Sequence, residues 1–367
     1  MKAKPKHRFQ IQLSAAITLI FAAQLALGSD APLWDGHETV EHYAERANLP
    51  PTKTLDLGSG VKLETVLIPA GKFIMGTPEP TVPGETVQVG QAILVMSGLL
   101  ALGLLIVVLW QAFSKRQRPK FSLRWLLLFT FVVSVGLYGG VRWHKTSQAW
   151  QEYMTAKGRY TLAESIEKSA HEVTLTKPFY VGKFDVTQEQ YQQVMGRNPS
   201  YFKGKDNPVD WVSWNDAQSF CNKLLKQTAW KVRLPTEAEW EYSCRAGTKS
   251  IYYSGDTHKD LDRVAWFDAN SKTTSPVGKK EANVFGLYDM HGNVWQSCED
   301  FFDEYPKQAV IDPTGPTKGA AHVVRGGSWA NDHTSCRSTD RTGSKPDNCN
   351  SNYGCRVVVA APSSRAP

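Results

Sequence analysis

The chain has 367 residues, of which 41% are hydrophobic, and it contains 12 Trp and 13 Tyr. This content is sufficient for a buried core, and the many glycines and prolines favour short elements over a helical bundle. The formal net charge of +7 does not indicate nucleic-acid binding, because many basic residues lie at the N-terminus and beside apolar segments, where membrane topology explains them.

Residues 1–28 have the three parts of a secretory signal peptide: a basic start, an apolar stretch and small residues at Ala26 and Gly28. An uncleaved anchor would show the same pattern. All six cysteines lie after residue 220, so export would place them where disulfides persist. Residues 29–60 are interpreted as a linker or cap. The sequence from Lys62, KLETVLIPAGKFIMGT, alternates apolar and polar positions around a Pro-Ala-Gly turn, which predicts a β-hairpin.

Two uncharged runs follow, at residues 92–113 and 125–141. The first is long enough to cross a bilayer as a helix, and the second is at the short end of the spanning range. The intervening sequence, SKRQRPKFSLR, is basic and lacks acidic residues, which places it in the cytoplasm by the positive-inside rule. We therefore predict a transmembrane hairpin over 91–143, a membrane localisation, and a main domain on the extracytoplasmic side, periplasmic or extracellular.

Short elements are predicted beyond a polar connector at 144–170. From His171, the sequence HEVTLTKPFYVGKFDVTQEQYQQVM predicts two short strands and a helix. Ser213 begins an amphipathic helix, and Thr236 with Glu239 three residues later forms a capping box for the next helix. The segments SIYYSG and RVAWFDAN predict short aromatic strands.

Three cysteines, Cys336, Cys349 and Cys355, fall in the C-terminal run from Val323 to Val359. The run is rich in Gly, Ser, Asn and Asp, which predicts loops between short strands. We expect a reactive or a bridged thiol here.

Six blocks occur in order across residues 61–81 and 171–359: IPAGKFIMG, KPFYVGKFDVTQEQY, NPVDWVSWNDA, RLPTEAEWEYSCRAGT, FGLYDMHGNVWQ and RGGSW. Together they resemble the sulfatase-modifying-factor family, whose type member is the formylglycine-generating enzyme. The resemblance implies an α+β fold class: a single C-type-lectin-like domain with little regular secondary structure. That domain would comprise 61–90 and 171–360, interrupted by the inserted two-helix transmembrane hairpin and followed by a tail at 361–367. Long insertions into surface loops are tolerated because loop-closure entropy grows slowly with length.

The family resemblance implies a copper oxidase, in which two cysteines after the GGS-aromatic motif bind Cu(I) and oxygen oxidises a cysteine of a client sulfatase. Soft thiolates select Cu(I). The two corresponding positions here are Asn331 and Cys336, so only one thiol is present and an amide replaces the other. We expect the catalytic residues to be Cys336 and Asn331, with His333 as a further candidate for which an exposed loop histidine is the favoured interpretation.

The same resemblance implies an alternative for the cysteines. A shift in the loop places Cys336 near a family cysteine that bridges to the position of Cys244, and Cys221 would then bridge to Cys355. Cys298 and the remaining thiol would form a third bridge or stay free, since sequence does not fix connectivity. The bridge between Cys244 and Cys336 is favoured over a copper-bound thiolate.

The resemblance also implies a structural calcium site in YDMHGNVWQ, with ligands from the side chains of Asp289 and Gln296 and the backbone carbonyl groups of Gly292 and Val294. Oxygen ligands on a tight glycine turn suit Ca²⁺. A glutamate usually stands in the family where this chain has Gln296, so one ligand charge is lost. A plain turn held by Asn293 is the alternative.

Three functions remain open at this level. The first is an oxidase acting on a protein or peptide client, such as a sulfatase, with Cys336 as its redox thiol. The second is a catalytically degenerate module that binds a peptide or glycan in a lectin-like cleft. The third is an oxidoreductase of different chemistry on the same scaffold. The expected partners are therefore a protein or peptide client and the membrane, with no nucleic acid.

Overall fold

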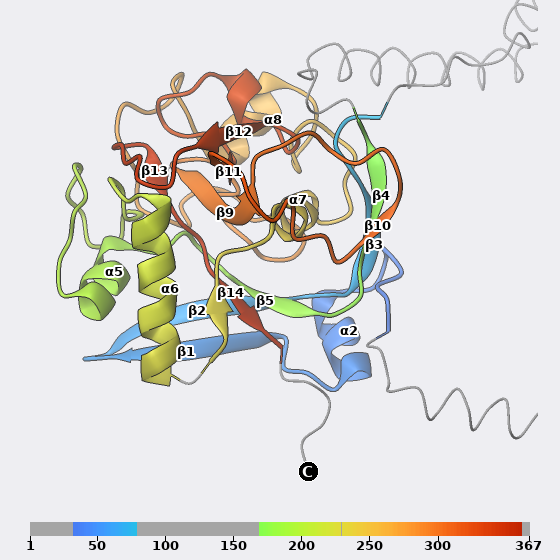
Figure 1. The fold of residues 1–367 in the computed structure, drawn as a ribbon, viewed down its shortest axis with the longest axis horizontal. Coiled ribbons are helices and arrows are strands. Elements are labelled where there is room, and N and C mark those ends of the chain that lie inside the picture. Colours follow the sequence, from blue (N-terminus) through green and yellow to red (C-terminus); the bar gives the residue numbers. More distant parts are fainter. Residues whose placement is uncertain (1–31, 79–168, 229, 362–367) are drawn as a thin grey trace, which may run out of the picture. The chain divides into compact units, whose positions relative to one another are not determined.

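The computed structural model describes residues 32–78 and 169–361, apart from residue 229 (Figure 1). The described residues up to Thr77 and from 169 onward belong to one compact unit. Its helices are α2 (Val40–Ala47), α5 (Gln188–Met195), α6 (Trp214–Thr228), α7 (Glu237–Arg245), α8 (His258–Val264) and the 3-10 helix η2 (His333–Cys336). Its strands are β1 (Thr52–Gly58), β2 (Val61–Ile68), β3 (Gly71–Met75), β4 (His171–Leu175), β5 (Phe179–Gly182), β6 (Val232–Arg233), β7 (Ala265–Trp266), β8 (His291–Gly292), β9 (Trp295–Phe301), β10 (Val310–Ile311), β11 (His322–Arg325), β12 (Arg341–Ser344), β13 (Tyr353–Gly354) and β14 (Val358–Ala360).

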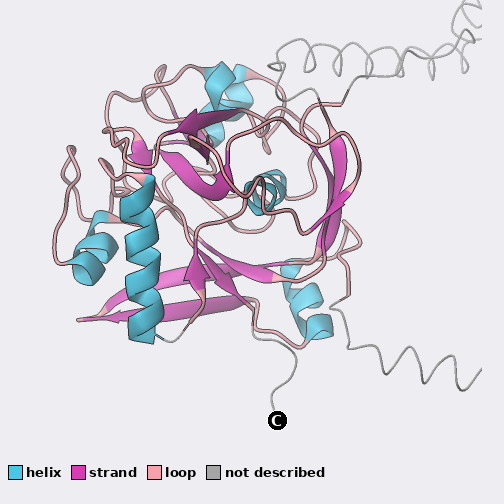
Figure 2. Ribbon diagram, in the orientation of Figure 1, coloured by secondary structure: helices cyan, strands magenta, loops and turns pink. Residues whose placement is uncertain are grey.

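The strands form four small sheets, with long loops between them (Figure 2). The largest has the order β1-β2-β5-β14-β6 and is antiparallel throughout. A second has the order β12-β11-β9-β13, a third β10-β4-β3, and β7 pairs with β8. Helix α6 crosses the largest sheet, and α7 lies between the sheets (Figure 1). This arrangement is the α+β fold that the sequence predicts.

Helix α7 is the centre of the core, because every one of its residues is buried. Its acidic side chains remain buried through ion pairs: Glu241 with Arg245 (2.9 Å) and with Arg325, and Glu237 with Arg341 (2.6 Å). Removing one partner of such a pair would leave a buried charge, which costs about 3–5 kcal/mol. These pairs therefore tie β11 and β12 to α7.

The predicted helix starts are confirmed. In α7 the Thr236 side chain accepts from the backbone N–H of Glu239, and the Glu239 side chain accepts from the backbone N–H of Thr236. Helix α6 begins in the same way, since Ser213 and Asp216 exchange side-chain-to-backbone bonds of 3.1 and 3.2 Å. Capping is a local property, so the sequence was sufficient to predict it.

The predicted hairpin around the Pro-Ala-Gly turn is wrong. Strand β2 pairs with β1 and β5, whereas β3 pairs with β4, so the turn is a corner between two sheets. The corner wraps closely around α7: a Cβ atom on Gly71 would lie 2.2 Å from the Tyr242 hydroxyl oxygen. The partner of β2 is β1, which falls within the segment 29–60 expected as a linker or cap.

The two aromatic segments also differ from the prediction. SIYYSG forms only an isolated bridge between Tyr252 and Gly255, and most of the region before RVAWFDAN is helix α8, leaving the two-residue strand β7. Helix α8 has its own capping box, formed by Thr257 and Asp260. Its seven residues are too short to show a clear helical period in the sequence.

The transmembrane part of the predicted fold class is corrected. Across 32–78 and 169–361, no helix is long and apolar enough to cross a membrane. Helix α6, with 15 residues, would extend only about 22 Å, less than a hydrocarbon core of about 30 Å. The inserted hairpin and the membrane localisation are therefore not supported. The runs at 92–113 and 125–141, and the signal segment 1–28, lie outside the described residues.

Candidate functional site

The predicted site lies in the turn that follows β11. Gly326 and Gly327 have φ angles of +96° and +72°, which favour glycine. A Cβ atom on Gly327 would lie 2.6 Å from the Cys336 Sγ atom, so the turn packs directly against that thiol. Buried Ser328 follows, and its hydroxyl donates to the Asn331 side chain. The turn thus brings Asn331 and Cys336 to one place in the fold.

Asn331 is held by hydrogen bonds in this turn. Its Oδ1 atom accepts from the Trp295 indole N–H at 2.9 Å as well as from Ser328. Its backbone carbonyl accepts from the Asp268 N–H at 3.0 Å. Two donors occupy the two lone pairs of the amide oxygen. Asn331 is therefore a structural link between β9 and the turn.

Cys336 is fully buried among apolar side chains. It belongs to a small cluster with Tyr252, Leu261, Val264 and Phe267. Burial raises the pKa of the Cys336 thiol, and nearby acidic groups, first Asp340, raise it further. The thiolate is the form that acts as nucleophile and metal ligand, so this thiol is in its unreactive form at neutral pH.

His333 differs from the buried Cys336 in being accessible to solvent. It is exposed to solvent at the start of η2, and its ring centroid lies 5.5 Å from that of His258. Its backbone carbonyl accepts from the Tyr252 hydroxyl at 2.8 Å. The backbone of His333 thus contacts the side chains that surround Cys336, whereas its imidazole lies at the surface.

These residues do not fit a Cu(I) centre. One thiol is available, it is buried and protonated, and the amide oxygen in the second position already accepts two hydrogen bonds. Within the described part of the chain, no group of three or more His, Cys, Asp and Glu side chains could hold a metal ion. We therefore derive no oxidation step at this site.

The predicted disulfides are also absent, because all six cysteines are free thiols. Cys244, expected to bridge to Cys336, instead has its Sγ atom 3.8 Å from His291 Nε2 and 3.9 Å from the Ser338 hydroxyl. Cys221 and Cys355 are both buried, and burial raises the pKa of each thiol. Only Cys349 is exposed.

The predicted calcium loop is buried and tightly bonded. Gln296 is hydrogen-bonded at both ends of its amide: Oε1 accepts from Trp240 Nε1 (2.8 Å) and Arg356 Nε (2.9 Å), and Nε2 donates to the Asp289 carbonyl (2.8 Å). The guanidinium of Arg356 already supplies a positive charge next to the position where the family carries a carboxylate. Gln296 is therefore not available as a calcium ligand in this arrangement.

Asp289 is the member of the set that keeps a free oxygen. Its Oδ2 atom accepts from the Gly278 N–H at 2.7 Å, but Oδ1 is buried without a partner among the described residues. Burial raises the pKa of this carboxyl. The calcium prediction now depends on Asp289 Oδ1 and the carbonyl groups of Gly292 and Val294, and it stays a prediction.

An aromatic patch beside this turn escaped the sequence reasoning. We define it as Tyr201, Phe202, Trp211 and Trp329. Phe202 packs edge-on against Trp329 with centroids 5.2 Å apart, and Tyr201 stacks on Trp211 at 6.0 Å. Tyr201 and Trp211 are 66% and 43% exposed, which is unusual for large apolar side chains that contact one another. The Trp-rich block NPVDWVSW was the signal that could have indicated it.

The patch is held in place by strained and buried groups. Trp211 has a φ angle of +60°, which is an outlier for a bulky residue, and its N–H donates to the Asn350 carbonyl at 3.0 Å. Asp210 accepts from the Tyr201 N–H at 2.6 Å, and burial raises the pKa of Asp210 to about 6. Strain that presents a tryptophan to solvent is a feature of binding surfaces.

The sequence of this chain is similar to a known family model and to proteins of other organisms. Residues 142–361 match the family model described as the sulfatase-modifying factor enzyme 1-like domain. The chain is 30% identical over 257 residues to the chaperone protein LppX of Paenibacillus barcinonensis, covering 56% of this chain and 88% of LppX. It is also 30% identical over 215 residues to the formylglycine-generating enzyme of Mus musculus, covering 54% of this chain but only 55% of that enzyme.

A solved structure supports the fold independently. Treponema denticola variable protein 1 superposes with a TM-score of 0.59 at 23% identity, covering 85% of this chain and 100% of that one. At this identity the likeness concerns the fold alone. The fold is thus shared with a protein whose sequence is distant.

Proposed function

Because the chain belongs to the sulfatase-modifying factor enzyme 1-like domain family, we propose that its domain binds a polypeptide segment of a partner protein at the aromatic patch and does not oxidise a thiol. The observation that carries this proposal is the state of the family's active-site turn. The Asn331 amide oxygen already accepts two hydrogen bonds and Cys336 is buried in an apolar cluster, whereas the nearby side chains of Tyr201 and Trp211 are exposed to solvent.

The patch has the properties of a protein-binding surface. Tyr and Trp are enriched at the energetic centres of interfaces, because each offers a large rigid contact area at small entropic cost. Trp329 and Trp211 both bond the loop around Asn350: the Trp329 indole N–H donates to the Ser351 carbonyl at 3.0 Å, and the Trp211 backbone N–H donates to the Asn350 carbonyl at 3.0 Å. The Trp329 ring is therefore oriented before a partner arrives, and the Trp211 ring is stacked on Tyr201, which lowers the entropic cost of binding.

A polypeptide is the partner that the relatives suggest. The family description names sulfatases, which are proteins, as what its members modify, and one relative is named a chaperone. The chain spans about half the length of the mouse formylglycine-generating enzyme, so the activity of that whole protein does not transfer with the fold. What we carry over is the recognition of a protein client.

The proposal can be tested with peptides. A phage-displayed library of random peptides is selected against the full chain, and the binding of one selected peptide is measured by fluorescence anisotropy. We expect Trp211→Ala to weaken that binding by about tenfold or more, as for an interface hot spot. Trp230→Ala is the matched control, because Trp230 is also partly exposed but packs against Lys53. Equal loss in both variants, or none in Trp211→Ala, would contradict the proposal.

The oxidase alternative is tested with the same reagents. A cysteine-containing version of the peptide is incubated with the chain, Cu(I) and oxygen, and its mass is followed. We expect the thiol to remain unconverted, because Cys336 is buried and protonated. Conversion that disappears in Cys336→Ser would overturn this part of the proposal.

A further inference from the structure

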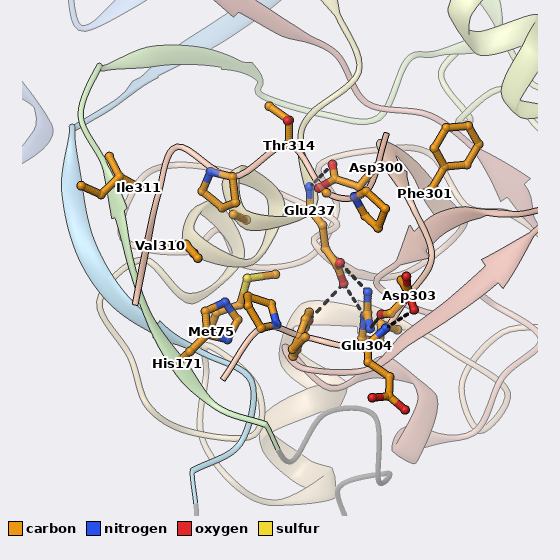
Figure 3. Close-up of a pocket in the computed structure, with 17 residues that line it drawn as sticks. Met75, His171, Glu237, Asp300, Phe301, Asp303, Glu304, Val310, Ile311 and Thr314 are labelled. Carbon is orange, nitrogen blue, oxygen red and sulfur yellow. Dashed lines mark hydrogen bonds and ion pairs between the residues drawn. The ribbon is translucent and has the colours of Figure 1, made fainter. Parts of the chain in front are cut away.

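The structure also contains a cavity of about 500 Å³, and Figure 3 shows the residues that line it. It is enclosed by strands β4 and β10, the end of β9, the loop at 302–316 and the first turn of α7. No residue of the candidate functional site lines it. Its volume falls in the range of small-molecule sites, about 300–1,000 Å³.

The walls of the cavity are largely apolar. Met75 and Tyr305 are buried in them, and Val310 and the 69% exposed Ile311 continue the apolar surface toward solvent. Pro313 stands beside them. The cavity thus offers an apolar passage of the kind that accommodates an alkyl chain.

Carboxylates lie at both ends of this passage. Glu237 and Asp300 are buried at its inner end, while Asp303 and Glu304 are exposed near its mouth. Arg341 is the one Lys or Arg among the described residues that line the cavity. Its guanidinium pairs with Glu237 through bonds of 2.6 and 2.7 Å, and no ion pair joins the other three carboxylates to a cation in the described part of the chain.

Two strong hydrogen-bond donors of the cavity, the Arg341 guanidinium and the Tyr305 hydroxyl, bond other groups of the protein. The remaining Arg341 donor, Nη1, bonds the Asp303 carbonyl at 2.6 Å. The Tyr305 hydroxyl donates to Glu237 Oε1 at 3.0 Å. A ligand with acceptor groups would therefore find no side-chain donor among Arg341 and Tyr305.

Two buried acceptors, by contrast, remain available in the walls of the cavity. Asp300 is 5% exposed; its Oδ2 accepts from the Glu237 N–H at 2.8 Å, while Oδ1 bonds no other described residue. His171 is also 5% exposed, and its Nδ1 atom lies 3.2 Å from the Ser169 carbonyl oxygen. A carbonyl can only accept, so Nδ1 carries the hydrogen and Nε2 of the neutral ring is an acceptor. No described residue bonds that Nε2.

We propose that this cavity binds an alkylammonium group, with the ammonium donating to Asp300 Oδ1 and the alkyl chain lying along Met75, Tyr305 and Val310. Free acceptors, engaged donors and an excess of carboxylates all select a cationic donor. The apolar passage selects a chain of several methylene groups. A free diamine and a lysine side chain share this chemistry.

The charges around Asp300 support the proposal. Burial, and then the neighbouring Glu237 carboxylate, raises the pKa of Asp300 to about 7. Charged or titratable groups face it from each packed element: Glu237 and Glu239 of α7, Arg233 of β6, Arg341 of β12 and His171 of β4. An incoming ammonium would replace the proton of Asp300, so binding strengthens as pH rises through about 7, while an alkylammonium stays charged up to about pH 10.

Isothermal titration of the full chain with 1,5-diaminopentane at about pH 8 tests this site. We expect saturable binding that weakens by about tenfold or more in Asp300→Asn, since a hydrogen bond to a charged group contributes about 1.5–3 kcal/mol. Asparagine keeps an acceptor for the Glu237 N–H, so the fold is retained, and circular dichroism verifies this. Asp347→Asn, which removes an exposed carboxylate outside the cavity, should bind like the wild type.

Further probes define the chemistry. Pentan-1-ol, which lacks the ammonium, should not bind, and Nα-acetyl-lysine amide separates a lysine side chain from a free diamine as the natural source. Wild-type affinity should fall at about pH 5.5, and Asp300→Asn should lose this dependence. Absence of diamine binding, equal binding by Asp300→Asn, or a pH dependence that Asp300→Asn retains would each overturn the proposal.

Discussion

Gly327 and Cys336 are packed so closely that a Cβ atom on the glycine would lie 2.6 Å from the cysteine Sγ atom. We predict that Gly327→Ala lowers the free energy of unfolding by about 2–4 kcal/mol, because overpacking and a φ angle of +72° act together. Gly196→Ala is the control: its φ angle is +80°, but nothing lies within 4 Å, so backbone strain alone costs about 1 kcal/mol. Urea unfolding measures both, and equal losses would refute the packing argument.

The cysteines give a prediction about thiol reactivity. Cys349 is exposed and the other five thiols are buried, so a thiol reagent should label one cysteine in the native chain and six after denaturation without reductant. Peptide mapping should identify the native label as Cys349. Two labels after denaturation would mean that two disulfides have formed and that the free thiols described above are not the stable state.

The raised pKa of Asp300 leads us to predict that the stability of the chain depends on pH. Its folded-state pKa of about 7 lies above the ordinary value of 3.8, so the folded chain holds this proton more tightly than the unfolded chain. The free energy of unfolding therefore falls as pH rises from about 4 to about 7 and is level above that range. Asp300→Asn should remove this fall and be more stable than the wild type at about pH 8 by roughly 2–4 kcal/mol. Urea unfolding at two pH values measures it. The exposed Asp303→Asn should keep the wild-type slope.

Calcium removal should have little effect on stability. Arg356 supplies a cation at Gln296 Oε1, and this pair needs no metal to be satisfied. We expect the melting temperature in EDTA and in calcium chloride to differ by less than about 2 °C, the shift that corresponds to about 1 kcal/mol or less. A larger rise with calcium that is lost in Asp289→Asn would instead establish the predicted site.

The sequence predicted what local interactions decide. The capping box of Thr236 and Glu239 and the start of α6 at Ser213 depend on residues within one turn, and both are found as expected. The family resemblance predicted the α+β domain in the same way, from blocks of adjacent residues. The hairpin at the Pro-Ala-Gly turn failed, because the pairing of β3 depends on β4, which begins at His171 far along the chain.

At the candidate site, too, the sequence predicted the local features and missed the contacts between distant segments. Its motif predicted that Asn331 and Cys336 share one turn, but not that the Trp295 indole would donate to the amide oxygen. The burial of Cys336 depends on Tyr252 and α8, whose contribution no local pattern reveals. The cavity with Asp300 could not be predicted from the sequence, because its lining comes from five separate stretches of the chain.

The position of β14 determines when this domain can fold. Val358–Ala360 lie between β5 and β6 in the largest sheet, so a central strand of the core comes after nearly every other element in the order of synthesis. Until those residues leave the ribosome, β5 presents an open hydrogen-bonding edge, and such edges recruit other strands. At about 5–20 residues per second, β5 would wait roughly 10–35 s for its partner. A nascent chain of this protein therefore needs its β5 edge shielded during synthesis.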